Sequence, residues 1–315
     1  MKNAVNSAGD KAQYDENAKR LLGNKSILAH ILAKTVDEFK GMKPEDIVTY
    51  IEGEPKIGIV PIEPGLTNVE KTDESGQRLK GLNSESIEAN EGLIRFDIIF
   101  YVRLKNGLSQ IIVNVEAQKD EPVSYKILNR AIFYVSRLIS SQKERDFVNT
   151  NYDDIKQVFS IWVCMNMSKN SLSHFHIVKD EMLEPYDWKG NVDLLNIVMI
   201  GVTNELPEHD EKYELHRLIG ALLSDRLREN EKLDIIEKEY KIPLSNDFRK
   251  EVDTMCNLSQ GIVYRVTAEV TAKTLTDIIM SMYKNKFSLE QISLATKKSI
   301  DEVKKIIEEQ EAVLV

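Results

Sequence analysis

The part of the sequence that most constrains the fold is the stretch from Arg95 to Gln118, where two apolar runs flank Lys105-Asn106-Gly107. Asn-Gly between alternating apolar residues is the strongest short signal for a tight β-hairpin. Successive side chains of a strand point to opposite faces. With Asn-Gly at the turn, Asp97 therefore falls directly opposite Glu116, and we expect the two acids to share a face.

The two faces of this predicted hairpin differ in polarity. One face is apolar, which indicates a core surface, and it carries Phe96, Ile98, Phe100, Ile111, Val113, Val115 and Ala117. The other face carries the acids, and like charges directly opposite each other destabilise a sheet. A divalent cation between the carboxylates, or a proton on one of them, removes the repulsion. Magnesium suits such a site, because it binds one or two carboxylates and finds further ligands on phosphate.

A structural alternative for the acid pair remains open from the residues alone. The hairpin face could be solvated, with its acids paired to nearby cations: Arg95, Arg103 or Lys119. A register shift of one residue would also move Asp97 to the core face and remove the pairing.

The rest of the chain predicts an α/β core followed by a helical region. Helical periodicity near residues 21–39 and 124–142 and continuous apolar runs at 157–166 and 196–202 favour helices covering a mixed central sheet. Prolines and glycines mark residues 52–92, which we predict to be an irregular insertion containing a short strand. We predict a disordered tail at 1–20, an α/β domain at 21–204 and a helical region at 205–315.

Composition limits the class of protein. The 315 residues are 42% hydrophobic and 30% charged, with two cysteines and a polar N-terminus. There is no apolar run of the roughly 18 residues that span a bilayer and no signal-peptide pattern, so we expect a cytoplasmic protein without a membrane partner. The net charge of −9 does not indicate a nucleic-acid-binding surface, although a local cleft can be basic.

Several blocks of the sequence resemble the PD-(D/E)XK nuclease superfamily, and more narrowly its Rpn-like group of recombination-promoting, transposase-like nucleases. The resemblance rests on Asp97 and Glu116-Ala117-Gln118 in their order, and it covers roughly residues 24–200. Its blocks are NKSILAHILAKTVDEF, GLNSESIEANEGLIRFDIIFYVRL, IIVNVEAQKDEPVSYKILNRAIFYVSRLISSQ and NYDDIKQVFSIWVCMN. The later helical region with MCNLSQGI is similar to that group's C-terminal extension.

The resemblance implies a restriction-endonuclease-like core and metal-dependent hydrolysis of DNA phosphodiester bonds. Asp97, Glu116 and the backbone carbonyl of Ala117 would be ligands of Mg²⁺, for which Mn²⁺ would substitute. It also implies low sequence specificity and a link to recombination, mobile elements or defence against foreign DNA.

Gln118 occupies the position where the superfamily signature has lysine, although the Rpn-like group commonly has glutamine there. A glutamine offers neutral hydrogen bonds and no positive charge. We therefore expect Gln118 to orient a water or complete the metal shell, and cleavage to be slow or conditional. A third acid from Glu38, Glu70, Glu85 or Glu88 would complete the site, with Glu85 preferred.

Three side chains of the helix after the hairpin are candidate DNA contacts. Arg130, Tyr134 and Arg137 follow an i, i+4, i+7 spacing, which places them on one helix face. Arginine can bind phosphate through two hydrogen bonds, and tyrosine can stack on a base. The structural alternative is that Arg130 pairs with a core acid while Arg137 is solvated. For His174 and His176 we favour a structural role, since no third metal ligand has a recognisable spacing.

The C-terminal segment, SLEQISLATKKSIDEVKKII, has the pattern of two short helices joined by a turn. It is compatible with a helix-turn-helix, with a plain helical hairpin and with a homo-oligomerisation module. The leading hypothesis is thus a Mg²⁺-dependent DNA endonuclease. The alternative is a catalytically weak DNA-binding or regulatory protein that retains the nuclease fold.

Overall fold

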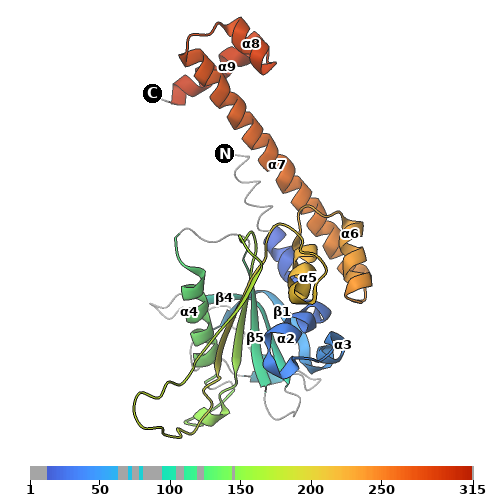
Figure 1. Ribbon diagram of the computed structural model, residues 1–315, viewed down its shortest axis with the longest axis vertical. Helices are drawn as coiled ribbons and strands as arrows, with labels where there is room; N and C mark the ends of the chain where they lie inside the picture. Colours follow the sequence, from blue (N-terminus) through green and yellow to red (C-terminus); the bar gives the residue numbers. More distant parts are fainter. Residues whose placement is uncertain are drawn as a thin grey trace. The chain divides into compact units, whose positions relative to one another are not determined.

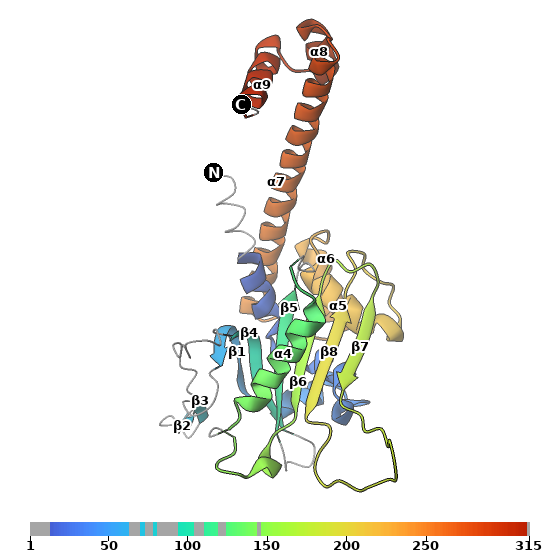
Figure 2. The same ribbon diagram turned by 90° about the vertical axis from the view of Figure 1, so that its left-hand side faces the viewer.

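The computed structural model contains a six-stranded mixed sheet (Figure 2). Its strands, in spatial order, are β1 (Ile51–Ile62), β4 (Ile94–Arg103), β5 (Gln110–Gln118), β6 (Val158–Cys164), β8 (Leu195–Gly201) and β7 (Ser171–His176). β1, β4 and β5 are antiparallel neighbours, β5, β6 and β8 are parallel, and β7 is antiparallel to β8. The predicted α/β class with a mixed sheet is confirmed.

The structure describes residues 13–62, 70–72, 78–80, 94–103, 110–118, 124–143 and 146–313. One compact unit extends over Lys11–Cys256 and another contains Asn257–Val315. The sequence had suggested a boundary near residue 204. The helices that follow the sheet belong to its unit because they bury apolar side chains such as Leu218, Ile219 and Phe248.

Helices cover both faces of the sheet (Figure 1). α4 (Ile127–Ser140) lies on one face, and α2 (Lys25–Thr35) and α5 (Glu214–Leu223) lie on the other. The α4 side buries an apolar cluster that includes Ile99, Tyr101 and Trp162. The expectation of a polar hairpin face is therefore wrong over most of its length: α4, which connects parallel strands β5 and β6, covers that face.

The N-terminal region departs from the predicted tail. Residues 13–22 are helical, and a stripe of that helix is buried, comprising Tyr14, Ala18, Leu21 and Leu22. These positions follow the i, i+4, i+7, i+8 spacing of one helix face. Burial of this stripe explains why the segment folds although its other residues are polar.

The predicted insertion at 52–92 also differs in part. Its first residues belong to the long edge strand β1, and β2 (Glu70–Thr72) pairs with β3 (Arg78–Lys80) in a separate two-stranded sheet. Two register shifts interrupt the β1–β4 pairing, and Pro55 and Pro61 lie within β1. β7, at the opposite edge, has no such interruption, and all six of its residues are exposed.

Short helical segments connect these elements. They are the 3-10 helices η1 (Asp37–Phe39), η2 (Val48–Tyr50), η3 (Tyr152–Asp154) and η4 (Glu211–Tyr213), the α-helices α3 (Pro44–Ile47) and α6 (Glu229–Asp234), and the π-helical turn η5 (Ile235–Glu239).

The C-terminal unit contains the predicted pair of short helices. α7 (Asn246–Lys284) leads into α8 (Leu289–Thr296) and α9 (Ile300–Val313), and a small core joins them through Ile279, Ile292, Val303 and Ile307. Ser288 caps α8, and Lys297 ends it in the left-handed conformation. On α9 and its approach, Lys298 and Lys305 pair with glutamates four residues later, Glu302 and Glu309.

Among the described residues, no helix combines the length and apolar character needed to cross a membrane.

Candidate active site

The carboxyl ends of the three parallel strands, β5, β6 and β8, lie side by side. Gln118 at the end of β5 pairs with Cys164 of β6, and Cys164 pairs with Gly201 of β8. One pair earlier along β5, Ala117 lies beside Val163. The carboxyl ends of parallel strands are where ligands of open α/β sheets bind. The predicted Glu116-Ala117-Gln118 segment therefore lies at the carboxyl end of β5, a position suited to a ligand-binding site.

The hairpin register agrees with the prediction. β4 and β5 pair antiparallel from Arg103 with Gln110 to Ile98 with Val115. The last pair is Ile98 with Val115, so Asp97 on β4 and Glu116 on β5 are the residues immediately beyond it, at the positions that the Asn-Gly turn predicted to be neighbours. The turn itself and the side chains of Glu116 and Gln118 lie outside the described residues.

Asp97 is bound by a cation that the sequence did not suggest. The Nζ of Lys19, on the N-terminal helix, lies 2.6 Å from Oδ1 of Asp97, and the two side chains are only 20% and 14% exposed, respectively. Of the cations considered from sequence, Arg103 instead pairs with Glu52. Lys19 is far from Asp97 along the chain, so no local spacing rule could have identified the pair.

Several contacts hold the N-terminal helix at this end of the sheet. Tyr14 donates its hydroxyl hydrogen to the carbonyl oxygen of Leu223 at 2.8 Å, and Nδ2 of Asn17 donates to the carbonyl oxygen of Glu251 at 2.7 Å. Burial raises the pKa of the Glu251 carboxyl group, and Arg20 opposes that shift. Lys19 thus lies on a helix that two side-chain hydrogen bonds, from Tyr14 and Asn17, hold in place.

The predicted DNA-contact residues form an aromatic and cationic cluster on α4. Arg130 donates hydrogen bonds to the hydroxyl groups of Tyr125 at 2.9 Å and Tyr134 at 2.8 Å. Its guanidinium carbon lies 5.4 Å from the ring centroid of Trp162, and Trp162 is the β6 partner of Glu116. The structure therefore brings Arg130 to the strand position that pairs with Glu116.

Arg137 has a different environment from the one considered from sequence. Its side chain is buried, with 7% of the residue exposed, so it is not a solvated surface cation. Tyr134 is partly buried and packs against Trp162, with ring centroids 5.6 Å apart. Arg130 and Tyr134 contact each other, whereas the structure assigns Arg137 to the protein interior.

The remaining sequence candidates are the acids proposed as a third metal ligand and the two histidines of β7. Glu85 and Glu88 lie outside the described residues. His174 accepts or donates one hydrogen bond with Oδ1 of Asn196 at 2.8 Å and stacks on His176. Within the described ranges, no group of three or more His, Cys, Asp or Glu side chains could hold a metal ion.

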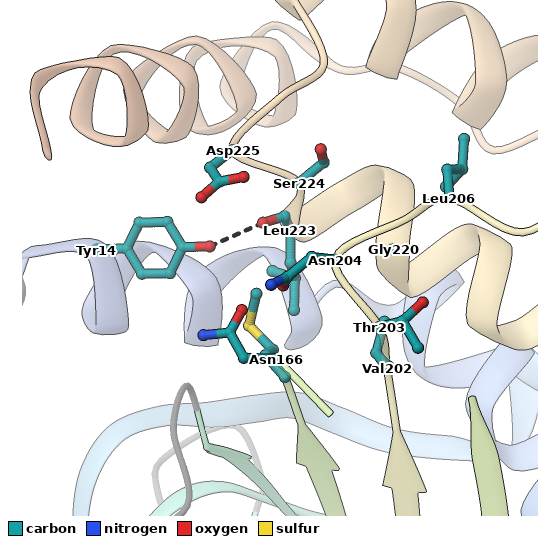
Figure 3. Close-up of a pocket in the computed structure, with 11 residues that line it drawn as sticks. Tyr14, Asn166, Val202, Thr203, Asn204, Leu206, Gly220, Leu223, Ser224 and Asp225 are labelled. Carbon is teal, nitrogen blue, oxygen red and sulfur yellow. Dashed lines mark hydrogen bonds between the residues drawn. The ribbon is translucent and has the colours of Figure 1, made fainter. Parts of the chain in front are cut away.

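A small cavity lies next to the carboxyl ends of β6 and β8 (Figure 3). Tyr14, Asn166, Thr203 and Asp225 contribute to its lining, and its volume is about 30 Å³. Its lining residues come from the N-terminal helix, from the segments that follow β6 and β8, and from the region of α5, so the pocket marks where these elements meet.

The residues at the strand ends fit a hard divalent cation by their chemistry. Asp97 and Glu116 directly follow the last β4–β5 pair, and Ala117 is the next residue along β5. Oxygen donors of this kind are those that Mg²⁺ and Mn²⁺ prefer. The ammonium group at Asp97 indicates that this carboxylate already attracts a cation.

No protein-family model, curated protein or solved structure matches this chain.

Proposed function

We propose that this protein is a metal-dependent endonuclease that hydrolyses DNA phosphodiester bonds with low sequence specificity. The observation that supports the proposal is the β4–β5 register, whose last pair, Ile98 with Val115, is directly followed by Asp97 on β4 and Glu116 on β5 near the carboxyl ends of the parallel strands. Mg²⁺ is the proposed cofactor, and Mn²⁺ would substitute for it.

The order of elements supports a restriction-endonuclease-like core. A helix, α2, precedes three antiparallel strands, β1, β4 and β5, and helix α4 then leads to the parallel strand β6. This α-β-β-β-α-β order agrees with the core implied by the resemblance of the sequence blocks to Rpn-like nucleases.

The proposed chemistry assigns a task to each side chain. A bound divalent cation would lower the pKa of a water molecule and offset charge on the phosphate. Asp97 and Glu116 would hold that cation, and Gln118 would orient the attacking water by hydrogen bonding. Attack of the water oxygen on phosphorus breaks the bond to one bridging oxygen, which leaves with a proton from solvent. Arg130, beside Trp162, would bind a neighbouring phosphate.

A second candidate function is a catalytically weak DNA-binding or regulatory protein with the same fold. The ion pair between Asp97 and Lys19 favours it, because the carboxylate is already neutralised within the chain. Gln118 also supplies no positive charge for the transition state. Under this alternative, the C-terminal helices would contribute DNA contacts or homo-oligomer formation.

A plasmid-nicking assay separates the two functions. Wild type is incubated with supercoiled DNA and Mg²⁺ or Mn²⁺, alongside Asp97→Asn and Glu116→Gln. Asp187→Asn is the matched control, because the Asp187 side chain is 82% exposed. We expect wild type and the control to nick DNA, chelation to stop nicking, and each site variant to be at least about 100-fold slower. Equal nicking by all variants would show that the site is elsewhere. A DNA gel shift without any nicking would favour the binding protein.

A further inference from the structure

The ion pair at Asp97 places a positive charge next to the proposed nuclease site. Phosphodiester hydrolysis develops negative charge on the attacking oxygen and the phosphate, and a fixed positive charge nearby stabilises it. Residue 118 is glutamine, so β5 provides no ammonium group there. Lys19 brings an ammonium group to Asp97 from a different element, the N-terminal helix.

The surroundings of Lys19 favour a fixed position over a mobile surface side chain. Tyr14 and Asn17, which precede it on the helix, make hydrogen bonds to other elements. Leu21 and Leu22, which follow it, are fully buried. Its own side chain is only 20% exposed. Arg20, the next residue, is instead 53% exposed and pairs with Glu16 on the same helix.

We propose that Lys19 belongs to the nuclease site and supplies from the N-terminal helix the positive charge that Gln118 lacks. The inference rests on the nuclease function proposed above. Without metal, Lys19 neutralises and orients Asp97. Asp97 would help to hold the divalent cation, and the nearby Lys19 ammonium group would add positive charge that stabilises the negative charge on the phosphate.

This arrangement gives Lys19 opposite effects on metal binding and on cleavage. A divalent cation must share Asp97 with the ammonium group and is repelled by it. Removal of the charge therefore tightens metal binding and slows cleavage. A residue that only supported the fold would weaken both, because loss of structure impairs the metal site and the active site together.

The experiment compares wild type with Lys19→Met and Lys19→Arg in the full-length chain. Mn²⁺ binding is measured by calorimetry without DNA, and nicking rates are measured at saturating Mn²⁺. For Lys19→Met we expect about tenfold tighter Mn²⁺ binding and about 100-fold slower nicking. Lys19→Arg keeps the charge, so we expect metal affinity near wild type and partial recovery of nicking. Arg20→Gln is the matched control and should change neither quantity.

The possible failures are distinguishable. If wild type nicks DNA and Asp97→Asn does not, but Lys19→Met nicks as fast as wild type, the role of Lys19 is overturned while the nuclease function stands. Weaker Mn²⁺ binding together with slower nicking in Lys19→Met also overturns it, in favour of a structural role. If wild type neither nicks DNA nor loses Mn²⁺ affinity on Asp97→Asn substitution, the proposed function fails and the inference fails with it.

Discussion

The Lys19–Asp97 ion pair should be energetically coupled in the metal-free protein. A double-mutant cycle tests this with Lys19→Met, Asp97→Asn and the combined variant. The substitutions keep similar side-chain sizes and remove one charge each. Other partners of Asp97 are affected equally in both arms of the cycle. The cycle therefore isolates the coupling free energy between Lys19 and Asp97.

The magnitude follows from distance and burial. At 2.6 Å, attraction between unit charges is about 6 kcal/mol for an effective dielectric constant near 20. Desolvation of both groups offsets much of that attraction. Exposed pairs contribute about 0.2–1 kcal/mol, whereas breaking a buried pair costs about 3–5 kcal/mol. With side chains 20% and 14% exposed, we expect a coupling of about 2 kcal/mol.

Urea unfolding with a chelator present, followed by circular dichroism, measures the free energy of unfolding of all four proteins. High salt should reduce the coupling only slightly, because buried charges are poorly screened. A coupling below about 0.5 kcal/mol would refute the reasoning, since that value is typical of a solvated surface pair.

Three further results are expected. Tyr14→Phe should lower the free energy of unfolding by about 1–2 kcal/mol, because the carbonyl of Leu223 loses a buried hydrogen bond; urea unfolding measures it. Burial lowers the pKa of Lys232 below 10.5, so the unfolded chain binds that proton more tightly. Stability should therefore rise with pH from the lowered folded-state pKa up to 10.5, and Lys232→Met should remove that rise in unfolding measured across this range. Arg130→Met should weaken DNA binding about tenfold in a fluorescence-anisotropy titration, through loss of a phosphate contact.

Matched variants test these three expectations. Tyr186→Phe removes a hydroxyl from a residue that is 63% exposed and should leave stability unchanged. Arg228→Gln removes an exposed guanidinium from outside the site and should leave DNA affinity near wild type. An unchanged pH profile in Lys232→Met would assign the rise in stability to other groups.

The sequence could predict those features that depend on local pattern. Asn106-Gly107 was enough to set the β4–β5 register, and the continuous apolar run of β6 indicated a strand buried on both faces. The N-terminal helix was missed because its polar residues dominate. Its signal was the helical spacing from Tyr14 to Leu22, which extends past the predicted end of the tail.

Other features depended on tertiary contacts. The face of β4 that carries Asp97 also carries Ile99 and Tyr101, and these apolar residues are buried because α4 packs over them. The length of β1 was not predicted because two prolines and two glycines interrupt its alternating pattern. Lys19 reaches Asp97 across a large separation in sequence, and only packing of the N-terminal helix reveals that pair.

The two edge strands of the sheet, β1 and β7, differ in how readily a further strand could pair with them. β1 presents prolines without N–H donors and two register shifts, whereas β7 presents a regular, exposed backbone. If two chains paired through β7, the edge strand left on the described sheet of each chain would be β1, with its prolines and register shifts. Further strand pairing would therefore meet an interrupted strand, which disfavours growth of such a pair into a fibre.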